Sequence, residues 1–280
     1  MKESVVSREE LENICIQFDV KGKLDCYEAI KTGHINDTFC VKFKRDDGTV
    51  KLYTLQSINT YVFQNPEIVM NNIMAVTEYL REQYHAEGLH ASRRVLRFYK
   101  TVNGENFYRD KKGRCWRLYV FVDKASTYNN VSDPELLFNA GKAFGEFQKR
   151  LSSFPMELLQ ETIPDFHNTP SRYRQLKDAI SRDPVGRAGE VGDEVAFFME
   201  RENIAGKLYN LQQDGILPLR VTHNDTKYNN VLIDDDTHEA ICVIDLDTVM
   251  PGLSVHDFGD AIRFATASAA EDEKDLSKVY

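Results

Sequence analysis

The hydrophobic pattern of this 280-residue chain changes its period near residue 122. Before that point apolar and polar residues alternate, as in Phe39 to Phe43 and Val50 to Thr54 on either side of the turn Asp46-Asp47-Gly48, which predicts a β-hairpin. After Asp123 the apolar residues recur every three or four positions, which is the spacing of one helix face. The change predicts an α+β fold, in which a small N-terminal antiparallel sheet with one helix precedes a larger, mainly helical part.

Start and stop signals place the individual elements. Asp133 and Pro134, for example, provide a helix cap and a proline in the first turn. The predicted elements, in chain order, are a helix from Pro66 to about Tyr84, strands at 95–99 and 116–121, helices from Pro134 and from about Asp193 to Gln213, and short strands at 219–222, 231–233 and 241–244.

Charge and cysteine content limit the classes of partner. A net charge of -9 and a pI near 5.4 argue against a broad nucleic-acid-binding surface, so we expect a small-molecule partner. The five cysteines include no CxxC pair, as expected of reduced thiols in the cytosol. The charged N-terminus does not resemble a signal peptide, and no apolar run approaches the roughly 18 residues that cross a bilayer. We therefore expect a cytoplasmic protein that binds neither nucleic acid nor membrane.

A polar segment between residues 221 and 230 contains the strongest functional signal. His223, Asp225 and Asn230 stand at the spacing of the kinase catalytic loop, H-x-D-x-x-x-x-N. Asp245 follows 15 residues after Asn230, directly behind an apolar strand, where such enzymes place a second metal-binding carboxylate. Phosphoryl transfer needs an acceptor for the proton of the attacking hydroxyl, cations for the phosphate oxygens and in-line positioning.

The residue types in this segment suit that chemistry. Asp225 is predicted to accept the proton and Lys227 to approach the transferring phosphoryl group. Asn230 and Asp245 are predicted to bind Mg²⁺ through hard oxygen atoms. An isolated His-x-Asp is usually a hydrogen-bonded turn, but here the eight-residue frame, the downstream strand and the change of period agree. We interpret His223 as an orienting residue rather than a base.

Neighbouring charged residues receive simpler interpretations. We expect Asp257 to brace the loop by hydrogen bonds, and Asp247 to be a surface or turn carboxylate. The pairs Arg93-Arg94 and Lys111-Lys112 are interpreted as solvated charges without a function.

Three segments resemble those of the N-acetylhexosamine 1-kinases, which belong to the aminoglycoside phosphotransferase and choline kinase-like superfamily. These segments are Gly33–Phe39, Leu219–Lys227 and Ile244–Gly252. The resemblance implies a protein-kinase-like fold with an N-terminal lobe at 1–121, a hinge at 122–128 and a catalytic lobe at 129–280. It also implies an ATP- and Mg²⁺-dependent enzyme that phosphorylates the anomeric hydroxyl of N-acetylglucosamine or N-acetylgalactosamine.

The same resemblance assigns further roles around a nucleotide between the lobes. Gly33 to Thr38 would cover the phosphates, with Gly33 as the turn glycine. His34 would reach past the γ-phosphate towards a sugar hydroxyl, and Asn36 would fix the turn or share that contact. The hinge backbone that would pair with adenine comprises Phe121, Val122 and Asp123.

Two departures from the kinase pattern leave alternatives open. Gln56 stands where kinases place a strand lysine, and it keeps a hydrogen-bond donor for the nucleotide while losing the charge. The relatives continue with further helices beyond the position of Tyr280, so we expect the C-terminal lobe of this chain to be truncated.

Three other functions are compatible with these residues. The acceptor could be a choline-like amine, homoserine, methylthioribose or another sugar, because the catalytic loop does not read the acceptor. The chain could also be a nucleotide-binding pseudokinase that scaffolds a partner. A metal-dependent hydrolase could use the same aspartates, but it would leave the small N-terminal sheet without a role.

Overall fold

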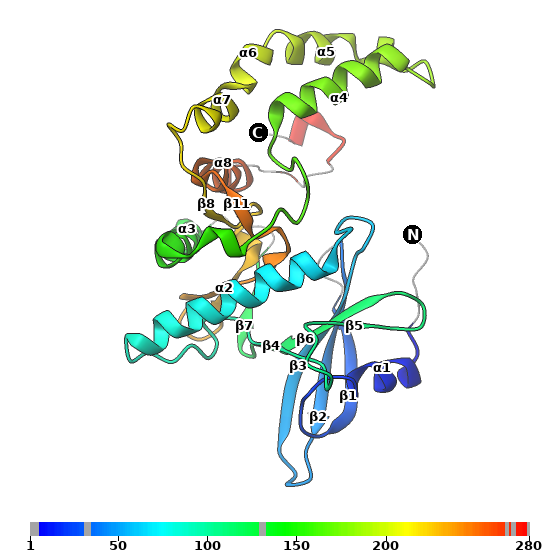
Figure 1. The fold of residues 1–280 in the computed structure, drawn as a ribbon, viewed down its shortest axis with the longest axis vertical. Coiled ribbons are helices and arrows are strands. Elements are labelled where there is room, and N and C mark those ends of the chain that lie inside the picture. Colours follow the sequence, from blue (N-terminus) through cyan, green and yellow to red (C-terminus); the bar gives the residue numbers. More distant parts are fainter. Residues whose placement is uncertain (1–5, 31–34, 129–132, 267–268, 270–272, 279–280) are drawn as a thin grey trace.

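The N-terminal part of the protein is an antiparallel sheet in the computed structural model, which describes residues 6–30, 35–128, 133–266, 269 and 273–278 (Figure 1). The strands are β1 (Lys23–Ile30), β2 (Asp37–Lys44), β3 (Val50–Ile58), β4 (Phe98–Tyr99), β5 (Tyr108–Arg109) and β6 (Cys115–Val120). They lie in the order β1-β2-β3-β6-β4, and β5 also pairs with β6. The predicted hairpin is confirmed as β2 and β3, which pair with Phe43 opposite Lys51.

Each face of this sheet packs on one helix. α1 (Arg8–Cys15) covers the face to which Phe39, Val41 and Phe43 contribute their buried side chains. α2 (Pro66–Ala86) covers the other face and buries Val69 and Ile73, which recur at helical spacing. The helix predicted from Pro66 is therefore confirmed, and it lies between the sheet and the C-terminal part (Figure 1).

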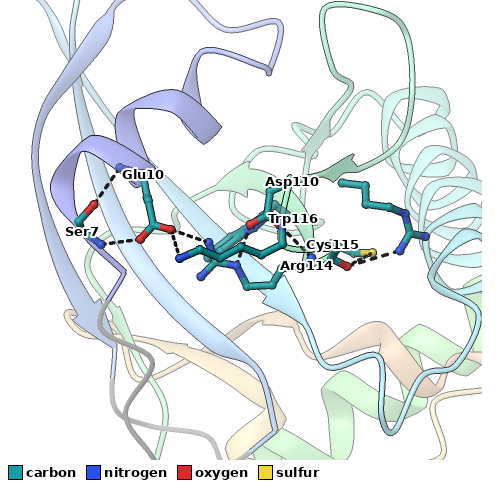
Figure 2. Close-up of polar contacts among 9 residues, drawn as sticks. Ser7, Glu10, Asp110, Arg114, Cys115 and Trp116 are labelled. Carbon is teal, nitrogen blue, oxygen red and sulfur yellow. Dashed lines mark hydrogen bonds and ion pairs between the residues drawn. The ribbon is translucent and has the colours of Figure 1, made fainter.

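Polar contacts also hold α1 on the sheet (Figure 2). Ser7 and Glu10 form a capping box at the start of α1, and Glu10 also pairs with Arg114 at 3.3 Å. Arg114 pairs with Asp110 at 2.7 Å, and Asp110 accepts a hydrogen bond from the indole of Trp116 at 3.0 Å. Neither α1 nor β1 was identified from the sequence: α1 has only 8 residues, and β1 is exposed along almost its whole length.

The C-terminal part contains two small sheets and the helices packed on them. The strands β7 (Ala125–Ser126), β9 (Val231–Asp234) and β10 (Ala240–Val243) form one sheet, and β8 (Arg220–Thr222) and β11 (Met250–Gly252) form the other. α3 (Pro134–Arg150) begins after the predicted cap Asp133 and packs Phe144 against Val231 of β9. α8 (Ser254–Ala265) lies against β8 and α3. The chain that leaves β8 therefore runs between α8 and the end of β10.

The chain between α3 and β8 forms an arc of helices at the end of the molecule far from the sheet (Figure 1). It contains α4 (Thr169–Arg182), α5 (Gly192–Met199), α6 (Glu202–Ala205) and α7 (Lys207–Gln213). The prediction of one helix from Asp193 to Gln213 is wrong, because the chain breaks near Arg201 and at Gly206. Within these described residues, α5, α6 and α7 have no side-chain cap and bury no residue, so neither capping nor packing overcomes the breaks.

The predicted α+β architecture, with a small antiparallel sheet followed by a larger part rich in helices, is confirmed. Across the described ranges, none of the helices has the length and apolar character needed to cross a membrane.

Candidate active site

His223 anchors the segment that follows β8. Its side chain is fully buried, and its ring lies 5.3 Å from that of Phe144 and 5.9 Å from that of Phe147. Its Nε2 lies 2.9 Å from the carbonyl oxygen of Ile244, and its Nδ1 accepts a hydrogen bond from the backbone of Asp225 at 3.3 Å. Both ring nitrogens thus contact backbone groups, which favours an orienting role over that of a base.

Two carboxylates of α8 hold the backbone of the same segment. Asp257 accepts hydrogen bonds from the backbone N–H groups of His223 at 2.9 Å and Asn224 at 2.8 Å. Asp260 accepts another from Thr226 at 2.8 Å. Asn224 has a φ of 65°, in the left-handed region that non-glycine residues seldom adopt, so its conformation needs this support. Asp257 therefore makes the bracing contacts expected from the sequence, and Asp260 adds one that the sequence did not indicate.

The segment brings Asp225, Lys227 and Asn230 together. Nδ2 of Asn230 donates to the backbone oxygen and to Oδ2 of Asp225, each at 2.9 Å. Nζ of Lys227 lies 3.5 Å from Oδ1 of Asp225. The side chains of Asp225 and Lys227 are 29% and 24% exposed, so a ligand can reach both.

Asp245 joins this group from the end of β10. The backbone N–H of Ile244 donates to the backbone carbonyl oxygen of Asn230 at 2.9 Å. This bond fixes the end of β10 beside the segment. Asp245 presents surface to solvent, but protein atoms closely surround its carboxyl group. The loss of hydration that these surrounding atoms cause, followed by the repulsion of Asp247 and Asp225, raises the pKa of Asp245 to about 6.

The donor set suits a divalent cation. Carboxylates that repel one another are stabilised by positive charge placed near them. Asp245 and the amide oxygen of Asn230 are hard oxygen donors, and Mg²⁺ often takes one or two of these beside phosphate oxygens and water. Among the described residues, no group of three or more His, Cys, Asp or Glu could hold a metal. The oxygen donors of Asp245 and Asn230 fit an ion whose other ligands are phosphate oxygens and water.

Asp247 lies in a turn, as the sequence analysis allows, but it is not on the surface. It is 2% exposed and forms an ion pair with Arg117 of β6, which is 3% exposed. Burial by itself lowers the pKa of Arg117, but the attraction of Asp247 outweighs it and leaves that pKa above its usual value. The prediction failed because the two partners lie 130 residues apart in the sequence.

Arg117 is a residue of the site that the sequence analysis missed. A signal was available, because a charged residue inside the apolar strand Cys115–Val120 must find a partner when it is buried. Oε1 of Gln56 accepts from Nε and Nη2 of Arg117 at 3.0 and 2.6 Å, and Nε2 of Gln56 donates to Thr38 at 2.9 Å. Both ends of the Gln56 amide are used inside the protein, and its role in binding nucleotide stays a prediction.

The turn predicted to cover the phosphates is described in part. Gly33 and His34 lie outside the described residues. Asn36 donates to Oδ2 of Asp247 at 2.8 Å and accepts from the backbone of Asn59 at 2.9 Å. These contacts favour the interpretation in which Asn36 fixes the turn.

The predicted hinge residues connect β6 to β7. The N–H of Phe121 donates to β3 at 3.3 Å, Val122 is buried and Asp123 is exposed. Arg93 donates to the carbonyl oxygen of Asp123 at 2.9 Å and pairs with Asp234 at 2.7 Å. Arg93 therefore ties this connection to β9, and its interpretation as a solvated charge is wrong.

Comparisons with known proteins agree with this architecture. Residues 29–277 match the model of a family described as the phosphotransferase enzyme family. An aminoglycoside phosphotransferase from Alicyclobacillus acidocaldarius has a similar structure, with a TM-score of 0.58 at 14% identity over 95% of this chain and 73% of that chain. A spectinomycin phosphotransferase in complex with ADP and spectinomycin gives 0.57 at 13% identity, over 97% and 82%. An amicoumacin kinase in complex with AMP-PNP and Ca²⁺ gives 0.56 at 10% identity, over 97% and 74%. The predicted kinase-like fold is confirmed.

Proposed function

Because the chain belongs to the phosphotransferase enzyme family, we propose that it is a kinase that moves the γ-phosphoryl group of ATP to a hydroxyl of a small molecule. The observation that carries this proposal is the grouping of Asp225, Asn230 and Asp245 just after β8 and β10. Phosphoryl transfer requires a proton acceptor and metal ligands in this arrangement. The proposed units are a nucleotide-binding lobe at 1–121, a hinge at 122–128 and a catalytic lobe at 129–280.

Each residue of the group has a distinct role in this proposal. Asp225 accepts the proton of the attacking hydroxyl, and the amide of Asn230, 2.9 Å from Oδ2, fixes the carboxylate. Lys227 offsets negative charge on the phosphoryl group as it moves. Asn230 and Asp245 hold Mg²⁺, which supplies positive charge to the phosphate oxygens when it is bound. His223 keeps the segment in place and takes no part in proton transfer.

The nucleotide is proposed to lie between the lobes, with Gly33 to Thr38 over the phosphates. Adenine pairs with backbone groups of the hinge, at Phe121, Val122 and Asp123. Arg93 supports this edge, because it donates to the carbonyl oxygens of Asp123 and Lys124 at 2.9 and 3.0 Å. A hinge held in this way loses little conformational freedom when adenine binds.

We propose the anomeric hydroxyl of an N-acetylhexosamine as the acceptor. The support is the resemblance of Gly33–Phe39, Leu219–Lys227 and Ile244–Gly252 to the corresponding segments of N-acetylhexosamine 1-kinases. His34 contacts the sugar in this proposal, and Asn36 fixes the turn that carries it. Spectinomycin is bound by one structurally similar phosphotransferase, so an antibiotic is the alternative class of acceptor.

A substrate panel tests both levels of the proposal. The protein is incubated with ATP, Mg²⁺ and N-acetylhexosamines, other sugars, choline, homoserine, methylthioribose or spectinomycin, with the Asp225→Asn variant as control. Mass spectrometry and ³¹P NMR are expected to identify a sugar 1-phosphate in the wild-type sample and about 10²-fold less of it in the control. A phosphorylated product of another kind would overturn the sugar assignment but would agree with the proposed kinase activity. If ATP raises the unfolding temperature but no acceptor is phosphorylated, the protein is a nucleotide-binding scaffold and not a kinase.

A further inference from the structure

A buried positive charge reaches the candidate site from β6 instead of β3. Gln56 stands on β3 where the sequence analysis expects the kinase lysine, and Arg117 stands directly opposite it on β6. Nε and Nη2 of Arg117 donate to Gln56, and Nη1 donates to Asp247. The glutamine therefore orients a cation that the neighbouring strand supplies.

Helix α2 supplies no carboxylate to this cation. All three acidic residues of this fully described helix, Glu67, Glu78 and Glu82, are exposed. The helix instead places Sδ of Met70 3.9 Å from Nη1 of Arg117. In protein kinases the strand lysine pairs with a glutamate of the helix beside the sheet, and both must be in place for catalysis. The described β3 and α2 lack both members of such a pair at these positions.

We propose that the ion pair of Arg117 and Asp247 takes the place of the lysine–glutamate pair and positions Asp245 for the metal–nucleotide complex. This inference rests on the proposed kinase function. Asp247 lies two residues after Asp245, and its second oxygen accepts from Asn36 at 2.8 Å. The carboxylate of Asp247 thus connects β6 and Asn36 to the turn that follows Asp245.

The backbone of Asp245 explains why such a connection is needed. Its φ of 58° and ψ of 60° are left-handed, and a non-glycine residue holds that conformation when its surroundings enforce it. The next three residues, Leu246–Thr248, form a single 3₁₀ turn in which Asp247 is buried. The hydroxyl of Thr248 donates to the backbone oxygen of His223 at 2.7 Å. The ion pair and Thr248 therefore fix the turn on two sides and set the direction of the Asp245 carboxylate.

A double substitution separates positioning from stability. Arg117→Met leaves the buried Asp247 charge unpaired and should strongly lower the temperature of unfolding. Arg117→Met combined with Asp247→Asn removes both charges and leaves an oxygen for Asn36, so most of the lost unfolding temperature should return. The remaining deficit reflects Oε1 of Gln56, which loses both donors of Arg117. Arg109→Met with Glu67→Gln is the matched control, since that pair is exposed and lies on the same lobe.

The decisive measurement is calorimetric binding of Mn²⁺–AMP-PNP and, separately, of metal-free adenosine. We expect the double variant to bind Mn²⁺–AMP-PNP about 10- to 100-fold more weakly, as when other residues that orient metal ligands are lost, and adenosine within about threefold of wild type. The control pair should leave both constants unchanged. A stable double variant with wild-type affinity for Mn²⁺–AMP-PNP would overturn the inference, because the ion pair would then serve the fold alone.

A charge-preserving variant decides the question if the double variant does not fold. Arg117→Lys keeps the charge, but one ammonium group cannot reproduce the bonds to both Gln56 and Asp247. We expect it to bind Mn²⁺–AMP-PNP about tenfold more weakly, and wild-type affinity would overturn the inference. A wild-type protein that binds no Mn²⁺–AMP-PNP would contradict the proposed function itself, which is a separate result.

Discussion

Two buried carboxylates hold the two sides of the candidate site in different ways. On the side of α8, Asp257 accepts from the backbone of His223 and Asn224 and thereby shapes the segment that carries Asp225. On the side of the sheet, Asp247 binds the side chains of Arg117 and Asn36. The first arrangement fixes the path of the chain and leaves Asp225 open to a ligand. In the second arrangement both oxygens of Asp247 are already bonded, one to Arg117 and one to Asn36.

The comparison predicts which property a substitution changes first. On the α8 side, Asp225 is partly exposed, so its substitution leaves no buried charge unpaired. Such a substitution should lower turnover more than it lowers stability. A residue of the buried ion pair cannot be altered alone without leaving a charge unpaired, so stability should fall first. Asp245 lies between the two sides, and substitutions there test whether both depend on it.

Asp245→Ala should give the largest effect. The loss of a metal ligand removes several kcal/mol of charge stabilisation from the transition state, so turnover should fall by roughly 10³ or more. Binding of MgATP should weaken far more than binding of adenosine. Steady-state kinetics and calorimetry check both expectations, with the exposed Asp236→Ala as control. Equal weakening of the two ligands would indicate a general loss of structure.

Asp225→Asn should come next and should affect turnover alone. The amide keeps the shape of the side chain but cannot accept the proton, so kcat should fall by about 10² or more. Because the side chain is partly exposed, the free energy of unfolding should stay within about 0.5 kcal/mol of wild type. Near-normal turnover would remove Asp225 from the catalytic role, and a large loss of stability would break the comparison.

The predictable part of the site is the part that is local in the sequence. His223, Asp225 and Asn230 lie within eight residues, and their spacing alone indicates how they meet. The hairpin, α2 and α3 were predicted for the same reason, because periodicity and caps act within one element. The ion pair of Arg117 and Asp247 could not be predicted, since strand pairing and the packing of two distant segments create it.

Asp257→Asn should lower both turnover and stability, with a smaller effect on turnover than Asp225→Asn. The amide oxygen of the new asparagine can accept from one of the two backbone N–H groups. The second backbone N–H then faces the NH₂ group of that asparagine and has no acceptor. One unsatisfied buried donor costs about 1–3 kcal/mol, which urea unfolding can measure. We expect kcat to fall about tenfold as the segment shifts, with little change in the Kd of adenosine. A change in stability without any change in kcat would show that the bracing does not reach Asp225.

Gly252→Ala should have the smallest effect on turnover and tests the junction between the two sides. Gly252 of β11 pairs with Arg220 of β8, and a Cβ atom there would overlap with the hydroxyl of Thr222 and lie 3.1 Å from Oδ1 of Asn224. That hydroxyl donates to Asn224 and so helps to set the residue before Asp225. The overlap should lower the free energy of unfolding by about 1–3 kcal/mol.

The control for this prediction is a second glycine close by. Gly259 lies in α8 with open space around the position of a Cβ atom, so Gly259→Ala should raise the free energy of unfolding by up to about 1 kcal/mol. Urea unfolding of the two variants should therefore give changes of opposite sign, with kcat lowered about threefold or less in Gly252→Ala alone. If Gly252→Ala is as stable as wild type, β8 and β11 are not packed closely enough to fix Asn224, and the backbone of the segment depends on α8 alone.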